Sequence, residues 1–250
     1  MILFIFVATA ILTLSCLLLP QKIIHTKYQK TSGNTLFQTF RDKGLYGEYK
    51  TFQTLNKLDC PKHILTNLYI PRADGTTTEI DLVLLTEKGI FVVESKNFSG
   101  WIYGHEQHKH WTQTFPNRKK FSFFNPVWQN KAHINALQAI LKLPHSASYQ
   151  SFIIFSERCV LKKIHSDSPY VTVLKRNKLL LKLRETLLAS EKIFTLDELD
   201  RIYRFLDHFT QKDQTVKAAH IKKVQSKHRK PNQNVIYLPL KQQKPKKTLQ

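Results

Sequence analysis

The stretch TEIDLVLLTEKGIFVVESKN, residues 78–97, decides the fold class of this chain. Two apolar runs, residues 78–85 and 89–95, are joined by a short turn at residues 87–89. Apolar runs of this length on either side of a turn predict two neighbouring β-strands. These strands form the centre from which the rest of the domain can be predicted.

Ionisable residues interrupt both runs: Asp81 lies in the first, and Glu94 and Lys96 lie near the end of the second. Because strand side chains alternate between two faces, Glu94 and Lys96 are expected on one face. Asp81 is expected to point into a core or a site, since burying a charge without a partner is costly. Acidic residues at strand ends are also common by chance, so this spacing alone carries little weight.

Two carboxylates and a lysine at this spacing suit the metal-dependent hydrolysis of phosphodiesters. Mg²⁺ prefers oxygen ligands, which Asp81, Glu94 and the carbonyl of Ser95 would supply. The ion would activate a water and offset the charge of the transition state, and Lys96 would orient that water or stabilise the developing charge. The pattern therefore predicts a nuclease centre with Mg²⁺ or Mn²⁺ as the cofactor.

The composition favours a polyanionic partner. The 250 residues are 42% hydrophobic, which is enough for a core, yet they carry a formal net charge of +21. An excess of this size favours nucleic acid or an anionic membrane surface; a basic solvated surface without any partner is the alternative. The three widely spaced cysteines form no disulfide or zinc pattern and indicate a reducing compartment.

Residues 1–20, MILFIFVATAILTLSCLLLP, predict a single transmembrane anchor. The apolar run from Ile2 to Leu19 is at the short end of what spans a bilayer. A cleaved signal peptide is the alternative, but a basic n-region and a small-x-small cleavage site are missing. Lys22, Lys27 and Lys30 follow the run, and such flanking charge predicts that the rest of the chain lies in the cytoplasm.

Helix and strand patterns organise the rest of the chain. Residues 21–38 are polar and are predicted to be a juxtamembrane linker, and residues 39–155 are predicted to be one α/β domain. The elements expected within it are a helix at 39–58, strands at 63–70, 78–85 and 89–95, aromatic-rich β segments at 98–104 and 110–115, a helix opened by Asn125 and Pro126 and ended by Pro144, and a strand at 151–155.

The C-terminal part is predicted to be helical and then disordered. Residues 156–210 form an extension with a weak strand at 170–174 and two helices, the second opened by a capping box of Thr195 and Glu198. Residues 211–250 are rich in Lys and Gln and are predicted to be a basic, largely disordered tail. Such a tail would contact nucleic acid or anionic lipid, and its charge suits either; disorder that only keeps the protein soluble is the alternative.

Aromatic and basic residues alternate after the central strands. They are Trp101, Tyr103, His105, His108, His110, Trp111, Arg118, Lys119, Lys120, Phe121, Phe123 and Phe124. This interleaving suits stacking on bases and contact with phosphates. The alternative is that the tryptophans and Tyr103 fill the core beneath the sheet. The three histidines lack nearby cysteines, which disfavours a zinc site.

Three stretches closely resemble one known family: GLYGEYKTF (44–52), TTEIDLVLLTEKGIFVVESKNFSGWIYG (77–104) and NPVWQNKAHINAL (125–137). The family is the nuclease-related domain, NERD, which is placed in the PD-(D/E)xK nuclease superfamily. The resemblance covers about residues 40–155 and rests on several motifs in order. It implies a restriction-endonuclease-like α/β core, with a central mixed β-sheet flanked by helices.

The resemblance also implies roles for five residues. Glu48 matches the helix-borne acidic residue that supports metal binding, and Asp81 matches the metal-binding aspartate. Glu94 and Lys96 match the (D/E)xK half of the motif. Gln129 matches a glutamine that follows Asn-Pro on a helix and points towards the site. An isoleucine precedes Asp81 where the superfamily has proline, a departure that NERD sequences typically share.

Together these features predict a membrane-anchored, metal-dependent nuclease that faces the cytoplasm and acts on DNA rather than RNA. The alternative is a non-catalytic, membrane-tethered nucleic-acid-binding module, and a membrane-surface scaffold built from anchor and tail is a third hypothesis. The predicted catalytic residues are Glu48, Asp81, Glu94, Lys96 and Gln129, and the predicted metal ligands are Asp81, Glu94, Glu48 and Ser95.

Overall fold

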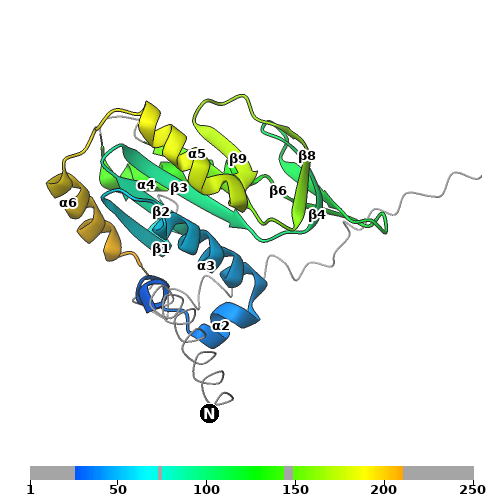
Figure 1. The fold of residues 1–250 in the computed structure, drawn as a ribbon, viewed down its shortest axis with the longest axis horizontal. Helices are drawn as coiled ribbons and strands as arrows, with labels where there is room; N and C mark the ends of the chain where they lie inside the picture. Colours follow the sequence, from blue (N-terminus) through cyan, green and yellow to red (C-terminus); the bar gives the residue numbers. More distant parts are fainter. Residues whose placement is uncertain (1–25, 73–74, 144–148, 211–250) are drawn as a thin grey trace, which may run out of the picture.

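Two mixed β-sheets and a set of helices make up the described part of the chain (Figure 1). A computed structural model describes residues 26–72, 75–143 and 149–210. The predicted anchor at 1–20 and the predicted basic tail at 211–250 lie outside these residues. None of the described helices combines the length and the apolar character that crossing a bilayer requires.

The larger sheet has five strands in the order β1-β2-β3-β7-β9. Antiparallel pairing joins the first three, and parallel pairing joins β3, β7 and β9, so the predicted central mixed sheet is confirmed. Each strand overlaps a predicted one. Their bounds are β1 Lys62–Pro71, β2 Thr77–Thr86, β3 Gly89–Lys96, β7 Tyr149–Phe155 and β9 Val171–Lys175.

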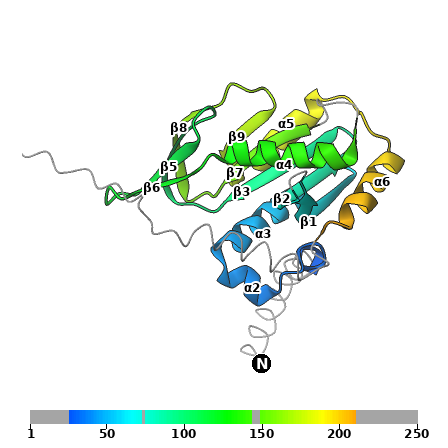
Figure 2. The same cartoon turned by 180° about the vertical axis from the view of Figure 1, so that it is seen from behind.

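Helices cover both faces of this sheet (Figures 1 and 2). The helices α3 (Lys43–Asn56) and α5 (Arg176–Ala189) share a core with one face. The helices α4 (Pro126–Leu141) and α6 (Leu196–Asp207) share a core with the other. The central strands therefore bury side chains on both faces, which explains why their apolar runs are almost continuous.

The single helix predicted over residues 39–58 is wrong: two helices, α2 (Leu36–Arg41) and α3, meet at Asp42. The Asp42 carboxylate accepts the N–H of Gly44 at 2.7 Å and that of Leu45 at 3.0 Å. The first N–H groups of a helix have no partner within it, so an aspartate here favours a new start over a continuous helix.

Asn125 begins α4, as the sequence predicts. Its side-chain oxygen accepts the N–H of Val127 at 2.9 Å, and Pro126 occupies the first helical position. Its side-chain nitrogen donates to the carbonyl oxygens of Glu106 at 2.8 Å and His108 at 2.7 Å. One residue thus starts the helix and fixes its direction relative to the preceding β turn. The predicted terminator, Pro144, lies outside the described residues.

A second sheet of four strands, in the order β6-β5-β4-β8, was not predicted. The two aromatic-rich segments do form strands, β4 (Gly100–His105) and β5 (His110–Thr114). Their partners are β6 (Lys120–Phe124) and β8 (Cys159–His165). Basic residues interrupt the apolar positions of both strands, KFSFF in β6 and CVLKKIH in β8, so neither shows a clean apolar alternation.

The inner face of the second sheet packs against the end of the larger sheet. Trp111 is 1% exposed, and its ring stacks on that of Phe155 with 6.2 Å between centroids. A Cβ added at Gly104 would lie 2.1 Å from the Trp111 indole, so only glycine permits this packing. The core interpretation is confirmed for Trp111, whereas Trp101 and Tyr103 are half-buried and, by strand alternation, lie on the opposite face.

Residues 156–210 complete both sheets. Parallel pairing joins β8 to β4 and β9 to β7. The predicted capping box of Thr195 and Glu198 is present at the start of α6. After α6 the carbonyl of Phe209 accepts the N–H of Tyr69 at 2.9 Å, which covers part of the edge strand β1.

Candidate active site

Asp81 lies at an irregularity in the pairing of β1 with β2. Ile80 and Val83 pack into the same hydrophobic core, although strand alternation would place them on opposite faces of the sheet. The register omits Asp81 and its opposite residue Asn67, which has a left-handed φ of 53°. Asp81 therefore stands where the strand pair changes face, outside the regular apolar alternation on either side.

Glu94 and Lys96 lie on one face of β3, as predicted, and form an ion pair. The distance from Lys96 Nζ to Glu94 Oε1 is 2.6 Å, and Glu94 is 1% exposed. Lys96 Nζ also donates to Gln129 Oε1 on α4 at 3.1 Å. The structure thus brings three of the predicted residues into direct contact between β3 and α4.

Asp81 joins this group through Ser95. The backbone N–H of Ser95 donates to Asp81 Oδ2 at 2.9 Å. The hydroxyl of Ser95 lies 3.0 Å from that of Thr51 on α3, which links the strand end to the helix on the other face. The metal-ligand role of the Ser95 carbonyl stays a prediction.

Glu48 is half-buried on α3. Its helix approaches the end of β3 closely, because a Cβ added at Gly47 would lie 2.6 Å from Asn97 Cβ. Arg176, at the start of α5, donates through Nη1 to the Gly47 carbonyl at 3.0 Å. The position of Glu48 therefore depends on a close helix–strand contact and on an arginine beyond residues 39–155.

His133 on α4 also contacts the candidate site, although no sequence motif singles it out. Its Nε2 lies 3.2 Å from Glu94 Oε2, and its Nδ1 lies 2.9 Å from the Thr78 hydroxyl. Arg72 donates in turn to that hydroxyl at 3.2 Å. A signal was present, since His133 follows Gln129 by one helical turn and must share its face.

The buried charges shift one another's protonation. Burial, followed by the charges of Glu94 and Glu48, raises the pKa of Asp81 well above its usual range. Burial would also raise the pKa of Glu94, but Lys96 and His133 outweigh it and hold that pKa at about 2. Burial would lower the pKa of Lys96, but Glu94 and Asp81 raise it. An ionised Glu94–Lys96 pair thus stands beside an aspartate that resists ionisation.

The donor set suits a hard divalent cation. Glu48, Asp81 and Glu94 are near enough for mutual repulsion to raise the pKa of Asp81, and a cation would relieve that repulsion. Within residues 26–72, 75–143 and 149–210, no three His, Cys, Asp or Glu side chains already stand grouped as around a metal ion. Glu94 directs its two oxygens at Lys96 and His133, so a cation would have to share this carboxylate with them.

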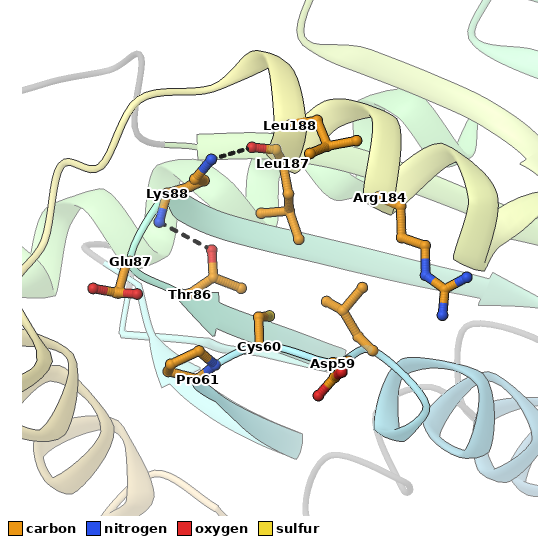
Figure 3. A pocket seen from close by; sticks show the side chains of 10 residues that line it. Asp59, Cys60, Pro61, Thr86, Glu87, Lys88, Arg184, Leu187 and Leu188 are labelled. Atoms are coloured by element: carbon orange, nitrogen blue, oxygen red, sulfur yellow. Dashed lines mark hydrogen bonds between the residues drawn. The ribbon is translucent and has the colours of Figure 1, made fainter.

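The domain also contains an apolar pocket of about 350 Å³, whose lining residues are drawn in Figure 3. It is bordered by the end of α3, the turn between β2 and β3, and the end of α5, where Lys88 Nζ donates to the Leu187 carbonyl. That turn precedes β3, whereas Glu94 and Lys96 end it. The pocket and the charged cluster therefore lie at opposite ends of one strand.

Comparison with known proteins identifies the family. Residues 43–156 match the sequence model of the nuclease-related domain, NERD. An uncharacterized protein of Bacillus anthracis is 36% identical over 190 residues, a match that covers 75% of this chain and 86% of the relative. This chain belongs to the NERD family. No solved structure matches it.

Membership confirms the predicted family and shows a nuclease-related function. The NERD match contains all five residues that the resemblance singled out, Glu48, Asp81, Glu94, Lys96 and Gln129. It also contains His133, while Arg176, which holds the Gly47 carbonyl, lies beyond it. The mixed α/β fold fits a restriction-endonuclease-like core. The catalytic and metal-binding roles of the residues stay predictions.

Removing the His133 ring should destabilise the NERD site. In His133→Leu, Glu94 Oε2 and the Thr78 hydroxyl would lose a buried partner, so we expect the free energy of unfolding to fall by about 2–4 kcal/mol in urea titrations. His133→Gln, which keeps a donor, should lose less. The exposed neighbour Asn135, changed to Leu, should shift stability by less than about 0.5 kcal/mol. Equal losses in the Leu and Gln variants would contradict this account.

The pair of Glu157 and Arg176 should make stability depend on pH. Arg176 Nε donates to Glu157 Oε1 at 2.9 Å, and this bonding lowers the pKa of Glu157. A carboxylate with a lowered pKa stabilises the fold above its unfolded pKa and loses that effect as pH falls through the folded one. The stability difference between wild type and Glu157→Gln should therefore shrink from about pH 6 to about pH 3 in thermal melts. It should stay below about 1 kcal/mol because Glu157 is 45% exposed.

Proposed function

We propose that this NERD protein is a divalent-metal-dependent nuclease that hydrolyses phosphodiester bonds in DNA. The observation that carries the proposal is the buried Glu94–Lys96 ion pair with Asp81 beside it. Neighbouring groups whose pKa values are shifted in opposite directions are typical of catalytic sites. Membership of a nuclease-related family supports the same class of reaction.

Asp81, Glu94 and the Ser95 carbonyl would hold Mg²⁺ or Mn²⁺, with Glu48 in support. When bound, the ion would supply a more acidic water and offset charge on the phosphoryl group. Burial of Glu94 limits the access of bulk water to this side of the site. The charges that the protein supplies there consequently act with less screening than they would in solution.

Lys96 supplies a fixed positive charge. Its raised pKa keeps the ammonium protonated at neutral pH, and Glu94 and Gln129 hold it in place. It can donate to the attacking water or to a phosphate oxygen that gains negative charge in the transition state. His133 holds Glu94 from the other side, so both charges are positioned before substrate arrives.

Cleavage assays on the detergent-solubilised full chain test the proposal. Wild type should cut DNA with Mg²⁺ or Mn²⁺ and stop in EDTA, and Asp81→Ala should abolish cutting. Single- and double-stranded DNA and RNA, compared in parallel, assign the substrate. Equal activity of wild type and Asp81→Ala would rule this mechanism out.

One observation favours a second function: the two oxygens of Glu94 are already directed at Lys96 and His133. A site held in this way suits a membrane-tethered module that binds nucleic acid without turnover. This function predicts salt-sensitive DNA binding that EDTA does not change, together with no cleavage of any of the four substrates.

We also propose that residues 1–20 anchor the protein and leave the NERD domain in the cytoplasm. The apolar run from Ile2 to Leu19 and the lysines after it support this orientation. The basic tail would add contacts with anionic lipid or nucleic acid. Extraction by alkaline carbonate, or cleavage of the domain by protease added outside intact cells, would contradict the proposal.

A further inference from the structure

The second sheet has an outer face that is open to solvent. Figures 1 and 2 show this sheet beyond one end of the larger sheet, whose faces carry α3 to α6. Trp111 and Ile102 bury the inner face against the larger sheet. On the outer face Phe124 and Val160 are each 45% exposed. Apolar side chains exposed on an open sheet face are typical of surfaces that bind a partner.

The outer face is cationic. The four strands, GWIYGH, HWTQT, KFSFF and CVLKKIH, contain no Asp or Glu, and they contain Lys120, Lys162 and Lys163. The β4–β5 turn does contain Glu106, whose carboxylate accepts the Ser166 hydroxyl at 2.8 Å and the Asp167 N–H at 3.0 Å. That carboxylate is thus engaged by the β8–β9 connection, and the strands themselves present only positive or neutral side chains.

Aromatic rings lie between these cations. Lys162 Nζ stands 5.9 Å from the Trp101 ring centre. The exposed ring of Phe124 meets Trp128 at 6.3 Å and His110 at 6.4 Å between centroids, edge to face in both pairs. Trp128 is itself 39% exposed. Cations interleaved with exposed rings suit phosphates and unpaired bases, because every base presents a flat face for stacking.

The sheet is also rooted at the candidate active site. The chain leaves the site after Lys96, forms β4, β5 and β6, and returns to it at Gln129. Lys96 Nζ lies 3.1 Å from Gln129 Oε1, so the segment 97–128 begins and ends beside the candidate active site. A nucleic-acid strand bound along this sheet would therefore have a short path to the Glu94–Lys96 pair.

We propose that the outer face of the second sheet binds single-stranded nucleic acid, with phosphates at Lys120, Lys162 and Lys163 and a base stacked on Phe124. The proposal deepens the proposed nuclease function and rests on it for the fate of the bound strand. Binding itself requires no cleavage. Unpaired bases are specified because a duplex hides its base faces from Phe124.

Fluorescence anisotropy of a labelled single-stranded oligonucleotide, with the full chain in detergent and EDTA, tests the proposal. The combined variant Lys120→Gln, Lys162→Gln, Lys163→Gln should bind about tenfold more weakly and show a salt slope smaller by about 2, since each contact adds about 0.7. Changing Lys57, Lys178 and Lys182, which are exposed elsewhere, to Gln removes the same charge and should change affinity less than about twofold. Arginine at the three outer-face positions should restore binding.

Phe124→Ala tests stacking separately: it should weaken single-strand binding about fivefold or more and leave duplex binding unchanged.

Equal losses in the two triple-glutamine variants would overturn the proposal. So would oligonucleotide binding that survives the outer-face changes while pelleting with phosphatidylserine vesicles is lost, because the face would then belong to lipid. If the protein binds through this face but never cuts, only the proposed nuclease function is contradicted. If the outer-face variant cuts and binds with unchanged affinity, only the present inference is contradicted.

Discussion

Asp81→Asn is expected to abolish cleavage and yet to make the metal-free protein more stable. The neutral amide loses the anionic metal ligand, so activity should fall by about 10³-fold or more. Burial and the charges of Glu94 and Glu48 raise the pKa of Asp81, so the fold disfavours the ionised form of this carboxyl. Asparagine removes that charge and can still accept the Ser95 N–H.

The sign of the pH effect follows from the raised pKa. A carboxyl with a higher pKa in the folded state destabilises the fold as pH rises above its unfolded pKa, and the cost disappears below it. The gain in melting temperature of Asp81→Asn in EDTA should therefore vanish towards about pH 4 and be larger at neutral pH than there. Asp59→Asn, at an exposed position, is the control and should change neither activity nor stability. A variant less stable than wild type in EDTA would contradict the argument.

Lys96→Met is expected to lose both activity and stability. The change leaves Glu94, which is 1% exposed, without its cationic partner. Breaking a buried pair costs about 3–5 kcal/mol, and His133 still contacts Glu94, so we expect a loss of about 3 kcal/mol in urea unfolding. Cleavage should fall by about 10²–10³-fold, as it does when a preorganised charge is removed from a site.

The double variant Glu94→Gln with Lys96→Met separates the two effects. Neutral residues in place of a buried pair are often nearly as stable as the pair, so most of the lost stability should return while activity stays absent. The exposed pair of Lys182 and Glu185, at 3.7 Å, is a control, and Lys182→Met should cost less than about 0.5 kcal/mol. A double variant no more stable than Lys96→Met would show that Lys96 does not hold Glu94.

Most of the larger sheet could be predicted because its signals are local. The apolar runs of β2 and β3 and the Asn125–Pro126 start of α4 each lie within a few residues. The shared face of Glu94 and Lys96 follows from strand alternation alone. The break between α2 and α3 does not follow from the apolar spacing, because an aspartate such as Asp42 suits the exposed side of a helix as well as its start.

The second sheet and His133 could not be predicted in the same way. Parallel pairing of β8 with β4 joins segments about sixty residues apart, as in the pair Trp101 and Val160. The strand β8 gives no clear apolar alternation on its own. His133 lies on a helix with many apolar positions, so its ring looks like core until Glu94 and Thr78 are seen beside it.

The sequence by itself determined the α/β class, the order of the main elements, the NERD family and the candidate residues. Periodicity and motifs can be read from short stretches of neighbouring residues. Only the tertiary structure decided which groups meet: Ser95 with Asp81, His133 with Glu94, and Arg176 with the helix of Glu48. These contacts depend on strand register and on helix placement over a sheet. Gly47, which lets α3 approach the end of β3, influences the helix placement, and Asn67, with its left-handed φ, influences the strand register. The effect of each residue appears only when distant segments pack together.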